Sequence, residues 1–121
     1  MNYDDNNIFS KILSGEIPCS KIYEDNYVLS FYDINPQKKI HALVIPKGKY
    51  VDLDDFNTNA SNEEIIGLMK GITTVAKKLG ISSIDGQGYR ALANISDYGG
   101  QEVPHLHFHL FGGEKVGKMV S

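Results

Sequence analysis

Residues 105–110 alternate strictly between imidazole and apolar side chains, and this segment constrains the fold more than any other part of the sequence. Successive side chains of a β-strand point to opposite faces of the sheet. The segment therefore predicts a strand with one face that packs into the core and one face available for chemistry. The apolar face would hold Leu106, Phe108 and Leu110, and the other face would hold His105, His107 and His109.

Three interpretations of this histidine stripe are open on the residues alone. Alternate imidazoles on a strand can chelate zinc, and His41 is the only further imidazole in the chain. Alternatively, one imidazole attacks phosphorus, a second gives a proton to the leaving group, and a third group orients them. A purely structural cluster is the third interpretation, and it requires a hydrogen-bond partner for every buried imidazole.

The rest of the sequence predicts an α+β fold with a five-stranded antiparallel sheet, one long helix and one short helix. Ser61 and Glu64 form a capping box at the start of the long helix, and Gly80 ends it. The acidic, Asn-rich residues 52–62 predict turns before that helix. The short helix is expected over residues 8–13, and the strands over 20–24, 27–34, 41–45, 88–95 and 103–111.

Length and composition indicate a single domain over residues 1–121, because no linker or repeat divides the chain. A net charge of −3 argues against a general electrostatic attraction to nucleic acid or anionic lipid. The first residues lack the basic and apolar pattern of a secretory signal, and Cys19 is the only cysteine. We therefore expect a cytoplasmic protein without nucleic-acid or membrane partners.

The histidine segment and its flanks resemble the histidine triad (HIT) superfamily. His-x-His-x-His at 105–109 is followed by two apolar residues, and the flanking Gly100-Gln101 and Gly112-Gly113 are similar to the Hint branch of purine nucleoside phosphoramidases. Glu102 and the residues after Gly113 are more similar to bacterial members of this branch than to animal ones. Further segments match the Hint pattern in the same order, at residues 8–12, 15–18, 23–25, 31–36, 41–47 and 88–94. The resemblance covers nearly the whole chain and implies a HIT-like fold.

The resemblance implies catalytic roles for all four histidines. His107 is expected to attack the α-phosphorus of a nucleotide and to hold the nucleotidyl group covalently until water removes it. This step needs a neutral ring in a fixed tautomer, and the backbone carbonyl of His105 is expected to accept a hydrogen bond from its other nitrogen. His109 is expected to bind phosphate and protonate the leaving group, with His41 supporting the triad.

The resemblance also implies a set of substrate-binding residues. Asp33 is expected to accept hydrogen bonds from the ribose hydroxyls, although on the sequence alone a turn cap before Asn35-Pro36 is the better explanation. The apolar purine slot is expected to comprise Ile8, Phe9, Ile12, Phe31 and Ile34. The phosphate contacts are expected from Asn94, Gly100, Gln101, Glu102 and Val103, whose hydrogen-bond donors would replace a basic patch.

The chain departs from the family pattern at two places. Some members bind structural zinc through a Cys-x-x-Cys pair, and the matching positions here are Asn7 and Ser10, so we expect no metal and no cofactor. Glu102 replaces the serine of animal Hint proteins and lies where the leaving group would pass. This carboxylate bears on leaving-group preference.

Together these features predict a hydrolase that cleaves the P–N bond of purine nucleoside 5′-phosphoramidates, of the adenosine 5′-monophosphoramidate type, through a nucleotidyl-His107 intermediate. One alternative is hydrolysis or transfer on dinucleoside polyphosphates or nucleotidyl sugars. Another is a non-catalytic nucleotide- or metal-binding regulatory module. The resemblance further implies a homodimer whose two sheets join into one.

Overall fold

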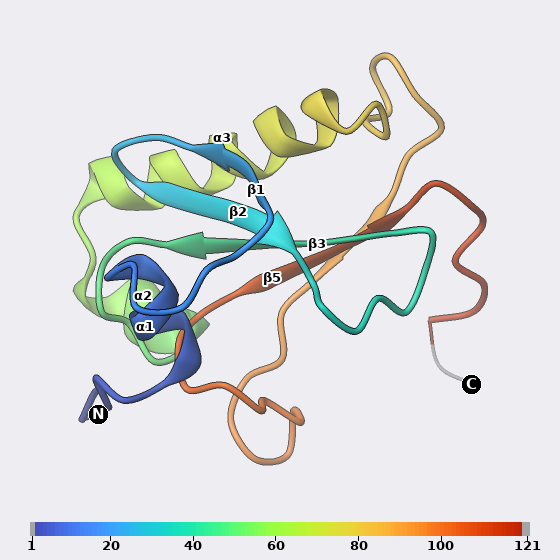
Figure 1. Cartoon of the computed structure of the whole chain (residues 1–121). Coiled ribbons are helices and arrows are strands. Elements are labelled where there is room, and N and C mark those ends of the chain that lie inside the picture. The colour runs from blue at the N-terminus through green and yellow to red at the C-terminus, as the bar shows by residue number, and fades with distance from the viewer. Residues whose placement is uncertain (1, 120–121) are drawn as a thin grey trace.

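The fold is built on one five-stranded antiparallel sheet, in the order β1-β2-β3-β5-β4 (Figure 1). A computed structural model describes residues 2–119. The strands are β1 (Lys21–Glu24), β2 (Val28–Tyr32), β3 (Ile40–Pro46), β4 (Arg90–Leu92) and β5 (Phe108–Gly112). The helices are α1 (Ile8–Leu13), α2 (Leu53–Asn59) and α3 (Asn62–Lys78). The predicted α+β class and the five-stranded antiparallel sheet are confirmed.

Side-chain alternation along the strands divides the core into two clusters, one on each face of the sheet. In Figure 1, α3 lies behind the sheet and α1 in front of it. The cluster on the α3 face comprises Ile22, Val28, Ala42, Val44, Phe56, Leu68, Ile72, Val75, Leu106 and Leu110. The cluster on the α1 face is smaller and comprises Phe9, Leu29, Phe31, Leu43 and Ile45. Because α1 covers only part of its face, the sheet beside it is free to form a pocket.

The long helix α3 has the limits that the sequence predicts. The Ser61 hydroxyl accepts from the Glu64 N–H, and the Glu64 carboxylate accepts from the Ser61 N–H, so the predicted capping box is present. Leu79 caps the other end, and Gly80 follows in the left-handed region at φ +74°. None of the helices described in residues 2–119 has the length and apolarity needed to cross a membrane.

The turn-rich stretch before α3 contains a second short helix, α2, which the sequence analysis did not predict. Its residues, Leu53 to Asn59, include Asp, Asn and Thr, all weak helix formers. Two features compensate for this low propensity. The Asp52 side chain caps the first turn by accepting from the Asp55 N–H, and Phe56 is only 1% exposed in the core. Tertiary burial of one aromatic ring therefore overrides the local preference.

The last two strands are shorter than predicted. Ladder pairing of β4 extends only over Arg90–Leu92, and β5 begins at Phe108 instead of residue 103. Residues 103–107 use their backbone groups elsewhere: the Leu106 N–H donates to the Tyr50 carbonyl, and the His105 N–H donates to the Val103 carbonyl. Pro104 has no N–H to offer a ladder. Two of the three triad histidines, His105 and His107, therefore lie outside the ladder, on the segment that leads into β5.

Candidate active site

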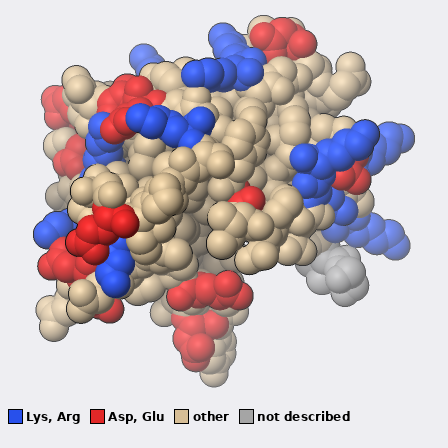
Figure 2. Space-filling model, in the orientation of Figure 1, with Lys and Arg blue, Asp and Glu red and all other residues tan. Residues whose placement is uncertain are grey.

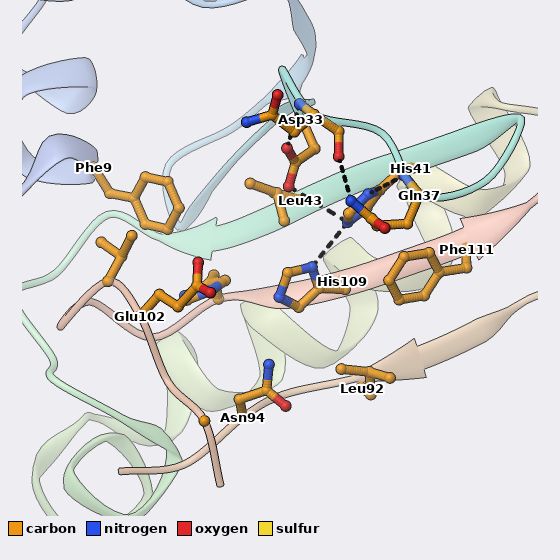
Figure 3. Close-up of a pocket in the computed structure, with 14 residues that line it drawn as sticks. Phe9, Asp33, Gln37, His41, Leu43, Leu92, Asn94, Glu102, His109 and Phe111 are labelled. Atoms are coloured by element: carbon orange, nitrogen blue, oxygen red, sulfur yellow. Dashed lines mark hydrogen bonds and ion pairs between the residues drawn. The ribbon is translucent and has the colours of Figure 1, made fainter. Parts of the chain in front are cut away.

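The histidine face of the sheet borders a pocket of about 340 Å³, which is the size of a small-ligand site (Figure 3). The pocket lies between α1, the loop after β2, and strands β3, β5 and β4. Nine of its lining residues are site residues expected from the sequence: Phe9, Asp33, His41, Asn94, Gly100, Glu102, Val103, His107 and His109. Segments far apart in the chain thus meet at one cavity.

His107 is held in a single tautomer at the pocket wall. Its Nδ1 lies 2.7 Å from the carbonyl oxygen of His105, and because a carbonyl can only accept, Nδ1 must carry the proton. Nε2 of a neutral ring then has a free lone pair. The Phe9 ring packs edge-on against the imidazole at 4.9 Å between centroids, and the side chain is 6% exposed. Burial lowers the pKa of His107, so the ring is kept neutral and nucleophilic.

His105, the first triad histidine, is fully buried and anchors the segment that carries His107. Its Nε2–H donates to the Pro46 carbonyl at 2.8 Å, and its Nδ1 accepts from the Tyr3 hydroxyl at 2.6 Å. Both ring nitrogens are therefore satisfied without a charge. His105 does not line the pocket, and its contribution to the site is the backbone carbonyl that fixes His107.

His41 and His109 form a chain of oriented hydrogen bonds. The register pairs Leu43 with His109 and His41 with Phe111, so the two imidazoles are diagonal neighbours on adjacent strands. The Gln37 backbone N–H donates to Nδ1 of His41, which leaves the proton on Nε2. That Nε2–H donates to Nδ1 of His109 at 2.9 Å. His109 then carries its own proton on Nε2, which faces the pocket (Figure 3).

Asp33 extends this chain to the pocket rim. Its backbone N–H donates to the His41 carbonyl, its Oδ1 accepts from the Asn35 N–H, and its Oδ2 lies 3.5 Å from Nε2 of His41. The carboxylate therefore caps the turn at residues 33–35 and also faces the cavity. The two interpretations of Asp33 from the sequence, turn cap and pocket residue, are compatible in the structure.

The donor atoms of Asp33, His41 and His109 lie within 4.8 Å of one another, close enough to consider a metal ion. A metal on Nε2 of His41 would require a lone pair there, while the Gln37 N–H requires a lone pair on Nδ1. A neutral imidazole cannot offer both lone pairs. This trio is better suited to orienting a proton than to holding a metal.

The loop between β4 and residue 103 supplies the lower wall of the pocket, and Gln101 holds it in shape. The Gln101 amide donates to the carbonyls of Val51 and Val103 and accepts from the Ser96 N–H. Gly100 follows a tight turn at φ +74°. The Asn94 amide faces the cavity from below His109 (Figure 3). Gln101 thus braces the loop instead of lining the pocket.

The structure separates most of the expected purine slot from the pocket lining. Phe9 lines the pocket, but Phe31 is 3% exposed beneath it and contacts it edge-on at 5.6 Å. Ile12 packs on the same core cluster. Ile8 is 41% and Ile34 is 86% exposed, both outside the lining. Ile34 lies beyond the end of β2, where strand alternation no longer determines its direction.

Several residues that the sequence analysis did not single out also border the site. The additional lining residues are Asn35, Gln37, Leu43, Leu92 and Phe111. Three of them could have been predicted, because residues two positions apart on a strand share a face: Leu43 follows from His41, Phe111 from His109, and Leu92 from Asn94. Tyr3 could not, because nothing in a sequence pairs it with a residue 102 positions away.

The His105 ring is expected to stay neutral from pH 8 down to about pH 5. Burial lowers its pKa to about 4, against 6.5 in the unfolded chain. The unfolded chain therefore takes up the proton first, and stability falls as the pH drops from 6.5 towards 4, by up to about 3 kcal/mol. An NMR titration of the ring protons measures this directly. A midpoint near 6.5 for His105 would contradict the assignment.

Comparison with known proteins agrees with the geometry. Residues 14–116 match the HIT domain family. A HIT-like protein of Azospirillum brasilense is 50% identical over 119 residues, which cover 98% of this chain and 95% of the relative. The purine nucleoside phosphoramidase of Escherichia coli K12 is 41% identical over 114 residues, covering 94% of this chain and 92% of the relative.

Solved structures share the whole architecture. A HIT family hydrolase from Clostridium thermocellum superposes with a TM-score of 0.84 at 37% identity, covering 98% of this chain and 99% of the other. The resemblance inferred from the histidine stripe and its flanking glycines is therefore confirmed. By family match, by relatives of similar length and by fold, the chain belongs to the HIT domain family.

Proposed function

We propose that this HIT-family protein hydrolyses the P–N bond of purine nucleoside 5′-phosphoramidates, such as adenosine 5′-monophosphoramidate. The observation that carries the proposal is the fixed ring of His107: its Nδ1–H is bound to the His105 carbonyl, which leaves a nucleophilic Nε2 at the pocket wall. The similarity to the Escherichia coli purine nucleoside phosphoramidase supports the choice of bond.

The reaction would proceed in two displacements at phosphorus. In the first, Nε2 of His107 forms a bond to the α-phosphorus, the P–N bond to the amine breaks, and the departing amine takes a proton from His109. In the second, water attacks phosphorus, its proton passes to His109, and the bond to His107 breaks to release the nucleoside monophosphate. Throughout, the His105 carbonyl accepts from Nδ1–H and stabilises the positive charge on the ring.

His109 must carry protons on both ring nitrogens for the first displacement, so its Nδ1 would give up the hydrogen bond that it accepts from the Nε2–H of His41. Burial also lowers the pKa of His109 to about 4 in the free protein. The bound phosphate supplies a negative charge beside the ring, and a nearby anion favours the imidazolium. The Asp33 carboxylate acts in the same direction. Binding of the anionic substrate would therefore be coupled to uptake of the proton that the leaving amine needs.

The remaining pocket residues suit a nucleotide. Asp33 presents a carboxylate to a ribose diol, and the Asn94 amide and the Gly100 backbone supply polar contacts for the phosphate. Phe9 offers an aromatic surface to the base. Ile8 and Ile34 are exposed apolar side chains next in sequence to the lining residues Phe9 and Asp33, and a bound purine would cover part of them.

We also propose that two copies form a homodimer. Strand β4 is an edge strand, so its outer hydrogen-bonding groups are available to a second sheet. On α3, Ile66 and Met69 are 53% and 48% exposed, which is unusual for apolar side chains of a helix that otherwise packs on the core. Sedimentation at micromolar concentration is expected to show a dimer. A monomer at all concentrations would contradict this proposal.

The direct test of the activity is a competition between substrates. Purified protein is incubated with an adenosine 5′-phosphoramidate and a diadenosine polyphosphate at equal concentration, and the release of AMP from each is followed. We expect the phosphoramidate to be consumed faster by roughly tenfold or more. Faster cleavage of the polyphosphate would assign the protein to the other hydrolytic class. Tight AMP binding without turnover of either compound would make it a binding module.

A further inference from the structure

The pocket is negatively charged, although its expected substrate is an anion. Asp33 and Glu102 both line it, and none of its described lining residues is Lys or Arg. On the α1 face of the molecule, Lys and Arg side chains lie towards the edges, and the centre is largely uncharged (Figure 2). A nucleotide that enters the pocket therefore meets carboxylates and imidazoles but no fixed cation.

The pocket imidazoles do not offset these carboxylates near neutral pH. Burial lowers the pKa of His41, His107 and His109 below its ordinary value. One of them gains a proton on substrate binding in the proposed mechanism, which balances the single negative charge of a nucleoside 5′-phosphoramidate. If a substrate carries further negative charges near phosphorus, no other positive group among the described lining residues can neutralise them.

The two carboxylates differ in how they are engaged. Asp33 accepts from the Asn35 N–H and lies 3.5 Å from the His41 ring. Glu102 is exposed, and within residues 2–119 no hydrogen bond or ion pair engages its carboxylate. It nevertheless interacts electrostatically with His107, on the side of the pocket away from Asp33 (Figure 3). Glu102 is thus an unneutralised charge beside the reacting ring.

We infer that Glu102 makes the enzyme selective for phosphoramidates whose leaving amine carries a second, positively charged group, such as a diamine or a basic amino acid. The inference rests on the proposed phosphoramidase function. A cationic leaving group would neutralise the free carboxylate at the mouth, a neutral one would leave it solvated, and an anionic one would be repelled. The selection acts on the leaving group alone, because the nucleotide portion is the same in all three cases.

Three adenosine 5′-phosphoramidates of matched length test this inference. Their leaving amines are 1,4-diaminobutane, n-pentylamine and 4-aminobutanoate, which carry a positive, a neutral and a negative distal end. We expect kcat/KM to fall in that order, by roughly fivefold at each step at low salt. Because the carboxylate is exposed, the differences should shrink as the salt concentration rises. This salt dependence is measured on the unmodified protein and needs no variant.

Two variants assign the effect to one residue. E102Q is expected to bring the three kcat/KM values within about twofold of one another. D97N is the matched control, since Asp97 lies in the same loop, is exposed and is outside the pocket lining, and its substitution changes the net charge by the same amount. It should retain the order of the unmodified protein. Equal rates for the three amines, or an unchanged order in E102Q, would overturn the inference, whereas failure to cleave any of them would overturn the proposed function instead.

Discussion

Replacing His107 with alanine is expected to lower kcat for phosphoramidate hydrolysis by about 10⁴-fold or more, because the substitution removes the only group proposed to bond to phosphorus. Water cannot replace it efficiently, since it lacks a lone pair oriented as that of Nε2 is by the hydrogen bond from Nδ1–H to the His105 carbonyl. The measurement is single-turnover release of AMP by the variant and by the unmodified protein. Acid quenching of the unmodified protein should also trap one nucleotidyl group on His107, detectable by mass spectrometry of its peptides.

The matched variant is H109A, which removes a proton donor but leaves the nucleophile. General acid catalysis contributes about 10² to 10⁴-fold, so the loss should be smaller than in H107A and should depend on the basicity of the leaving amine. Thermal unfolding of both variants shows whether either substitution has disturbed the fold. Turnover that survives in H107A, or an adduct on another residue, would refute the nucleotidyl-His107 intermediate.

Replacing Gly99 with alanine is expected to lower the free energy of unfolding by about 2 kcal/mol or more and to raise KM. A Cβ at this position would clash with the carbonyl oxygen of Ile95 and would lie 2.7 Å from the Ile95 nitrogen. These are backbone atoms, which cannot rotate away as a side chain could. The loop must therefore open, and it carries Gly100 and Glu102 into the pocket wall. Urea unfolding and steady-state kinetics measure the two effects.

Gly100 provides the control for this substitution. It has φ +74°, but no atom lies within 4 Å of the position of an added Cβ. G100A should therefore cost only the strain of a left-handed alanine, about 1 kcal/mol. If G99A were no less stable than G100A, close backbone packing would not be the reason for glycine at position 99.

Local patterns predicted the parts of this fold that depend on local chemistry. The Ser61–Glu64 capping box and Gly80 gave the limits of α3, because caps act over three or four residues. The alternation at 105–110 placed Leu106 and Leu110 in the core on the α3 face and the imidazoles of His107 and His109 at the pocket on the opposite face. Leu106 still packs in the core and His107 still lines the pocket, even though these residues form no ladder.

The features that the sequence did not reveal depend on tertiary partners. Helix α2 forms because Phe56 is buried in the core. Helix-propensity scales do not include tertiary burial of this kind. The tautomer of His41 is set by the backbone N–H of Gln37. Because almost every residue has a backbone N–H, this contact leaves no pattern in the sequence. Ile34 lies two residues beyond the end of β2, where strand alternation no longer applies, so its exposure could not be inferred from its apolar character.

The hydrogen bond between Tyr3 and His105 has a consequence for biosynthesis. It joins residues 102 positions apart, and the neighbouring contact between His41 and His109 spans 68. A ribosome delivers the chain from its amino end, so the early strands and α3 can collapse while the histidine segment is still being made. The nucleophile is oriented only when that segment docks against elements that have already folded. A nascent chain that ends before His109 would therefore lack the hydrogen bond between His41 and His109, and the proposed activity would appear only once this segment has docked.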